Sequence, residues 1–131
     1  MITNMKKLLF TLLLFTLFRA IAHGQSNPNE SSPKKIKLLV HITQGPENPT
    51  RAALGFLVAK TAIEDGHIVS LFLAGDAVRL LQDSVLNTLT GVGTGKLSEH
   101  YQIIVKGKPA VFALPNVLVR LSIESDRMFT Y

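Results

Sequence analysis

Residues 36–49 read IKLLVHITQGPENP, and this stretch decides the fold. The run over residues 36–42 is apolar on both faces, which is typical of a strand covered by helices on both sides. Gly45 and Pro46 end this strand, and Asn48 then supplies a helix N-cap before Pro49 at the first helical position. The stretch therefore predicts a buried strand that leads through a short loop into a helix over residues 49–65, which Gly66 ends.

The rest of the chain continues this alternation of strands and helices. A second buried strand is predicted over residues 68–74, and helices are predicted around residues 77–82, 97–105 and 115–125, with short strands at 110–113 and 128–131. Strands that alternate with helices form parallel sheets with right-handed crossovers. The sequence therefore predicts an α/β domain with a three-layer, flavodoxin-like open sheet.

The predicted helix over residues 49–65 has more apolar surface than it needs for one sheet. One apolar stripe is sufficient for a helix on the surface of a domain. This helix has two, formed by residues Leu54, Leu57, Val58 and Ala62 and by residues Ala52, Phe56, Ala59 and Ile63. The second stripe predicts a neighbouring helix or another subunit.

The first 24 residues have the layout of a secretory signal. Lys6 and Lys7 precede an apolar run over residues 8–18, and small residues follow, with Ala22 and Gly24 at positions that signal peptidase accepts. The run is shorter than the roughly 20 residues that span a bilayer. We therefore expect a signal peptide over residues 1–24, cleaved near Ala22 or Gly24, and a periplasmic or secreted protein with no stable membrane anchor after cleavage.

A polar linker separates this signal from the domain. Residues 25–35 read QSNPNESSPKK, which contains prolines and nothing to bury. We expect a disordered tether over residues 25–35 and one domain over residues 36–131.

The composition excludes several classes of function. The formal net charge is +5, but three positive charges lie in residues 1–24, so the expected mature chain carries only +2. That charge is not clustered, and we expect no nucleic-acid partner. The sequence contains no cysteine, which excludes disulfides, thiolate metal sites and cysteine nucleophiles. Its four histidines lack paired spacing, so we expect no metal, and no motif indicates a cofactor.

The glycine-rich stretch over residues 91–96 reads GVGTGK and does not fit a phosphate-binding loop. Such a loop has four residues between its first glycine and the Gly-Lys pair, followed by Ser or Thr. Here three residues intervene and Leu97 follows. The stretch predicts a flexible linker.

Polar residues follow the predicted strands at the edge where parallel sheets bind ligands. The loop before the first helix lies where free backbone amides can hold an anion. Asp76 and Asn116 belong to loops at the same edge. The predicted contacts of a small molecule or anion are Gln44, Gly45, Glu47, Asn48, Asp76 and Asn116.

His41 and Asp76 are the weak candidates for catalysis. His41 lies near the end of the first predicted strand, where a neutral imidazole could act as a general base. Packing with a hydrogen bond is the commoner role of such a histidine. Asp76 begins a predicted helix, so capping also explains it.

Several short motifs resemble the DsrE/DsrF-like (YchN-like) family, and they occur in the family's order. They are Gly45-Pro46-Glu47-Asn48-Pro49, Gly66-His67, Leu71-Phe72-Leu73-Ala74-Gly75-Asp76, Pro115-Asn116-Val117-Leu118-Val119-Arg120 and residues 126–131. The resemblance covers nearly all of residues 36–131. It implies a flavodoxin-like fold, often assembled as trimers or hexamers, and in several members a role in sulfur relay through a persulfide on a cysteine.

The chain departs from this family in two ways. It has no cysteine that could carry a persulfide. Between residues 105 and 112, roughly 20 residues of the family pattern are absent, which is about one strand and its crossover. Either a strand is missing, which would leave unpaired backbone groups and an open core, or the last elements pair differently.

The sequence thus predicts an exported DsrE-like domain without persulfide chemistry. We expect a homo-oligomerising or small-ligand-binding module rather than an enzyme. Two alternatives remain: a small-substrate enzyme that uses the His41 and Asp76 crevice, or a degenerate sulfur-relay homologue with no independent function.

Overall fold

The computed structural model describes residues 34–131. The predicted signal peptide over residues 1–24 and most of the predicted tether over residues 25–35 lie outside the described residues. Residues Lys35–Tyr131 form one compact unit. Its elements, in chain order, are β1 (Lys37–Ile42), α2 (Pro49–Glu64), β2 (Ile68–Leu73), the 3₁₀ helix η1 (Gly75–Leu81), α3 (Asp83–Leu86), β3 (Thr90–Gly91), β4 (Gly95–Lys96), α4 (Leu97–Val105), α5 (Pro115–Glu124) and β5 (Arg127–Thr130).

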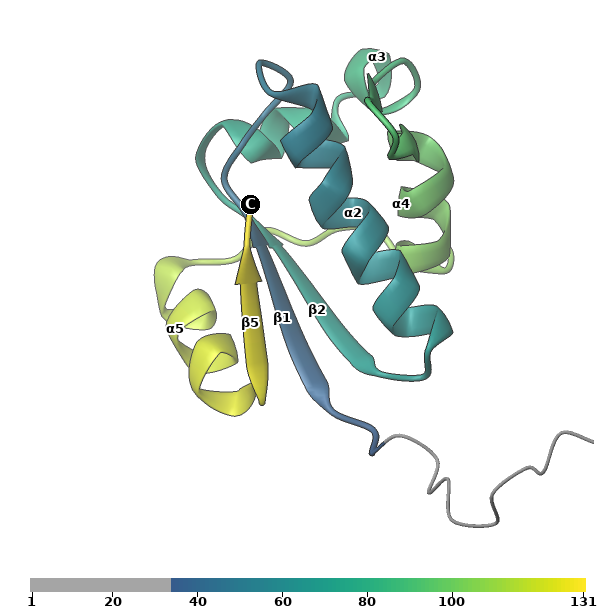
Figure 1. Ribbon diagram of the computed structural model, residues 1–131. Helices are drawn as coiled ribbons and strands as arrows, with labels where there is room; N and C mark the ends of the chain where they lie inside the picture. Colours follow the sequence, from purple (N-terminus) through teal and green to yellow (C-terminus); the bar gives the residue numbers. More distant parts are fainter. Residues whose placement is uncertain (1–33) are drawn as a thin grey trace, which may run out of the picture. The chain divides into compact units, whose positions relative to one another are not determined.

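The main sheet has the parallel arrangement that the sequence predicts. Its three strands lie in the order β2-β1-β5, and β1 is parallel to both neighbours. Figure 1 shows α2 across β1 and β2, while α5 lies beside β5 on the side away from α2. The chain therefore has an α/β fold of flavodoxin-like type. The last strand pairs directly with β1 and forms an edge of the sheet, so no strand of the described domain lies between β1 and β5.

The central strand is covered on both faces, as its composition predicts. Leu39 and Val40 point to opposite faces of the sheet, and both are fully buried. Ile42, on the same face as Val40, touches α2 so closely that a β-carbon added at Gly55 would lie 2.5 Å from the Ile42 Cδ1 atom. The absence of a side chain at Gly55 therefore lets the helix approach the sheet.

The second apolar stripe of α2 faces another helix of the same chain. The Phe56 ring lies 6.5 Å from the Tyr101 ring of α4, measured between centroids. Phe56 is fully buried in a core that also contains Leu97, the first residue of α4. Of the two expected explanations for the second stripe, the described domain thus supplies the neighbouring helix.

The glycine-rich stretch is not a flexible linker, and this prediction is wrong. Strands β3 and β4 form an antiparallel hairpin. The Val92 N–H donates to the Thr50 hydroxyl at 3.0 Å, and a β-carbon at Gly91 would lie 2.7 Å from the Thr50 Cα. Gly93 and Gly95 have positive φ angles, which glycine adopts without strain. The glycines therefore allow a tight turn that packs against the start of α2.

The short strand predicted at residues 110–113 is also absent. This segment is irregular, and Val111 and Phe112 are 84% and 92% exposed. A strand needs a hydrogen-bonded neighbour, and this segment pairs with neither edge strand of the main sheet, β2 or β5. The apolar residues of this segment are therefore left on the surface.

Candidate functional site

The carboxyl ends of the strands bring the predicted ligand loops together. The Thr43 N–H and hydroxyl both donate to the Tyr131 carbonyl, at 2.8 and 3.1 Å, which joins the loop after β1 to the end of β5. The Ala74 N–H donates to the Ile42 carbonyl at 2.9 Å, which joins the loop after β2. A β-carbon at Gly45 would lie 2.5 Å from the Asp76 carbonyl oxygen, so these two loops are in direct contact.

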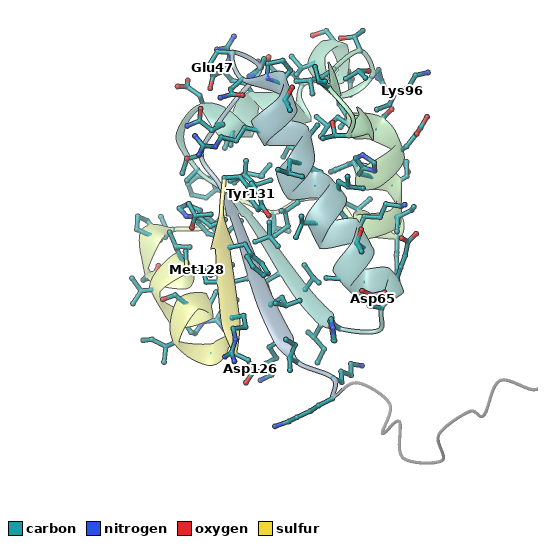
Figure 2. All side chains as sticks on the ribbon, in the orientation of Figure 1. Glu47, Asp65, Lys96, Asp126, Met128 and Tyr131 are labelled. Carbon is teal, nitrogen blue, oxygen red and sulfur yellow. The ribbon has the colours of Figure 1, made fainter. Side chains whose placement is uncertain are left out.

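The loop before α2 satisfies most of its own hydrogen-bonding groups. The Gly45 N–H donates to the Glu47 carboxylate at 2.6 Å, and the Asn48 N–H donates to the Gly45 carbonyl at 3.1 Å. The Asn48 side chain accepts from the Arg51 N–H at 3.3 Å, which makes Asn48 the N-cap of α2, as its position predicts. Figure 2 shows Glu47 at this end of the domain. A carboxylate of the chain itself therefore occupies the Gly45 amide that would otherwise be available to an anion.

Gln44 and Asn116 lie at the same edge of the sheet. Gln44 is half-buried in the loop, whereas Asn116 is exposed in the first turn of α5. Helix α5 leads into β5, which is parallel to β1, so the first turn of α5 lies at the carboxyl edge of the sheet. The fold thus brings all six predicted ligand contacts to one edge.

His41 is packed rather than hydrogen-bonded. Its ring meets the Phe72 ring edge-on, with 6.0 Å between centroids, and its buried Nε2 atom has no hydrogen-bond partner among the described residues. Burial lowers the pKa of His41, because desolvation disfavours the charged imidazolium. The neutral ring retains a basic nitrogen, but no hydrogen bond to Asp76 orients it within the described part of the chain.

Asp76 does not cap a helix, which corrects that interpretation. Helix η1 begins at Gly75, whose φ is +57°, and its cap residue is Ala74 with no side-chain hydrogen bond. Asp76 is consequently inside the first turn and exposed to solvent. No second titratable group among residues 34–131 is hydrogen-bonded to its carboxylate.

No group of three or more His, Asp or Glu side chains among residues 34–131 is arranged to hold a metal ion. No helix of this part of the chain is both long enough and apolar enough to cross a membrane.

A second surface, which we call the C-terminal apolar surface, was not predicted from the sequence. After His100 no described residue is buried, and α5 and β5 contain no buried residue at all. The large apolar side chains exposed in this part of the chain are Val111, Phe112, Leu114, Val119, Ile123, Met128 and Phe129. They lie on the segment before α5, on α5 and on β5, where Met128 and Phe129 point to opposite faces of the sheet.

The only sequence signal for that surface was the short connection after residue 105. The apolar spacing of residues 115–125 predicts a helix, but it cannot show that the helix lacks a partner. Whether the apolar side chains of that helix are covered depends on which strands lie beside it. The apolar spacing of the helix does not give the order of the strands in the sheet.

The parallel sheet and its flanking helices define a flavodoxin-like α/β domain. A model of the DsrE/DsrF-like family matches residues 37–107, which is more than half of the sequence. The chain therefore belongs to the DsrE/DsrF-like family. No curated protein and no solved structure matches it. The family match ends at Gly107, just before the C-terminal apolar surface begins.

Proposed function

We propose that this DsrE-like domain is an exported, homo-oligomerising module without persulfide chemistry or catalytic turnover. The observation that carries the proposal is the C-terminal apolar surface, where Phe112 and Ile123 are 92% and 78% exposed. Covering such side chains removes apolar area from water, which favours association by about 25 cal/mol per Å² before the costs of ordering. A second copy of the chain is the partner that is always present with it.

Two further observations favour assembly over the other functions considered. A persulfide requires a thiol, and the sequence has none. An anion at the loop before α2 would first have to displace the Glu47 carboxylate from the Gly45 N–H. The small-ligand alternative keeps Gln44, Gly45, Glu47, Asn48, Asp76 and Asn116 as its contacts, and the enzyme alternative keeps His41 and Asp76, but neither gains a hydrogen-bonded catalytic pair.

Sedimentation velocity of the protein, in the form that the cell produces, tests the assembly. We expect a species heavier than one chain whose share rises with protein concentration, as mass action requires. A sedimentation coefficient of a single chain at every concentration would contradict the proposal.

Export rests on the sequence of residues 1–24 and has its own test. Mass spectrometry of the protein from the periplasm or the medium should find a new N-terminus after Ala22 or Gly24. An intact N-terminus on protein that remains in the cytosol would overturn the proposed location.

A further inference from the structure

Strand β5 is the most exposed edge of the main sheet. It has a neighbour on one side only, because the strand order is β2-β1-β5. All four of its residues are exposed, whereas in β2, the other edge, only Ile68 is. Met128 and Phe129 are 44% and 43% exposed, and they point to opposite faces of the sheet. An uncovered edge of this kind is a template for pairing with another strand.

The backbone hydrogen bonds of Tyr131 show which residues of β5 face outward. The Tyr131 N–H donates to the His41 carbonyl, and the Tyr131 carbonyl accepts from the Thr43 N–H, so both backbone groups of Tyr131 point toward β1. Because these directions alternate along a strand, Phe129 also points toward β1, while Met128 and Thr130 point away from it. The outward N–H and C=O groups of Met128 and Thr130 are therefore available to a second strand.

We propose that two copies of the chain join through antiparallel pairing of their β5 strands about a two-fold axis at Met128. This inference rests on the proposed assembly and names its interface. In this register each Met128 exchanges two backbone hydrogen bonds with the Met128 of the second copy. Thr130 then lies opposite Asp126 of the second copy; within one chain the Asp126 N–H donates to the Lys37 carbonyl, so the two Met128 residues supply the backbone hydrogen bonds of the pairing. The two three-stranded sheets become one continuous sheet of six strands.

The side chains of β5 match each other in this register. Arg127 lies opposite Phe129 of the second copy, and Phe129 lies opposite its Arg127, so the pair occurs twice. A cation over an aromatic face is attractive, and directly opposite side chains are the closest neighbours in an antiparallel pair. The Arg127 guanidinium, which donates to the Asp126 carbonyl at 2.7 Å within one chain, would turn onto the ring. In this register no two side chains of the same charge lie opposite each other.

The register also accounts for the two apolar side chains of β5. Met128 meets Met128 on one face of the joined sheet, and Phe129 is covered by Arg127 on the other. A shift by two residues would instead set Phe129 opposite Phe129, Arg127 opposite Tyr131 and Met128 opposite Thr130, so Met128 would lose its apolar partner. A second copy is therefore the occupant that the strand's own sequence fits.

The absence of cysteine from the sequence allows a sharp test. In a hydrogen-bonded antiparallel pair the two Cα atoms are about 5.5 Å apart, which lies within the range that a disulfide spans. We expect the Met128→Cys variant of the full chain to form a covalent dimer rapidly under a mild added oxidant, which accepts the two electrons and two protons that the thiols lose.

The matched control is Thr130→Cys on the same strand. In the proposed register the two Thr130 residues are four positions apart along the strand, about 14 Å at the usual rise, so no disulfide can form within the pair. Val92→Cys, which is 86% exposed on the hairpin, measures random collisions. Thr130→Cys and Val92→Cys should therefore form covalent dimers at the same slow rate.

Equal rates for Met128→Cys and Thr130→Cys would overturn the inference. If the unaltered chain still sedimented as an oligomer, assembly would use another surface and the proposed function would stand. If the unaltered chain sedimented as a monomer, both the pairing of β5 and the proposed function would be contradicted. Unchanged far-ultraviolet circular dichroism shows that each variant remains folded.

Discussion

His41 couples the stability of the domain to pH through its burial. Its Nε2 atom has no hydrogen-bond partner among residues 34–131, and its ring packs on Phe72. Because burial lowers the pKa of His41 in the folded state, the unfolded chain takes up a proton more readily on acidification. The contribution of the neutral ring is fully present above the unfolded pKa, near 6.5, and is lost as the pH falls through the folded pKa.

Replacing His41 by phenylalanine should therefore flatten the pH dependence of stability. We expect the melting temperature of the unaltered chain to fall between about pH 7.5 and about pH 5, and that of His41→Phe to fall less. Thermal melts followed by circular dichroism measure the difference. Equal losses in both proteins would show that other groups dominate the response to acid.

Gly45 is required by contact rather than by backbone conformation. A β-carbon there would lie 2.5 Å from the Asp76 carbonyl oxygen and 2.6 Å from the Glu47 carboxylate. We expect Gly45→Ala to lower the free energy of unfolding by about 1 to 3 kcal/mol, the usual cost of overpacking.

Gly66→Ala is the comparison for Gly45→Ala, because Gly66 has a φ of +86° but no atom within 4 Å of an added β-carbon. Gly66→Ala should lower the free energy of unfolding by about 1 kcal/mol through backbone strain alone. Urea unfolding of both variants separates the two effects. A smaller cost at Gly45 than at Gly66 would contradict the close packing of the loops.

At the scale of elements, Asn48 decides where α2 begins. Its side chain accepts from the Arg51 N–H at 3.3 Å. We expect Asn48→Ala to cost about 1 kcal/mol, whereas Asn48→Asp should retain most of the stability because aspartate caps equally well. Urea unfolding measures both changes. If Asn48→Asp were as unstable as Asn48→Ala, the cap would not be the stabilising role of this residue.

Most elements could be predicted because their signals are local. The cap at Asn48, Pro49 and the terminating Gly66 define α2 without any knowledge of the sheet. The apolar run of β1 likewise predicts burial on both faces, and Leu39 and Val40 are fully buried. These features depend on residues that are close together in the sequence, so local patterns are enough to predict them.

The features that could not be predicted depend on distant partners. The hairpin around Gly93 forms because Gly91 can approach Thr50, and glycine spacing alone does not distinguish that packing from a linker. Residues 110–113 have the composition of a strand but pair with neither edge of the main sheet, β2 or β5. For the candidate site, the strand ends predicted which loops meet, but the Glu47 contact with the Gly45 N–H depends on a side-chain conformation that no motif specifies.

At the scale of the whole molecule, the short connection after α4 determines what is exposed. It leads the chain directly into α5 and β5, which joins β1 as an edge strand. The part of the chain that matches the DsrE/DsrF-like family, residues 37–107, contains the apolar core. The part that follows carries the C-terminal apolar surface, so the two parts differ in burial as well as in family likeness.

The central claim is that the exposed edge strand β5 of this C-terminal part is covered by a second copy of the chain. The most direct measurement is the molar mass in solution of Phe129→Lys, determined by light scattering beside Val92→Lys, an equally charged change at an exposed hairpin residue. Lysine at position 129 would face Arg127 of the second copy and repel it. We expect Phe129→Lys to have the mass of one chain and Val92→Lys to keep the mass of the assembly. The same mass for both variants would contradict the claim.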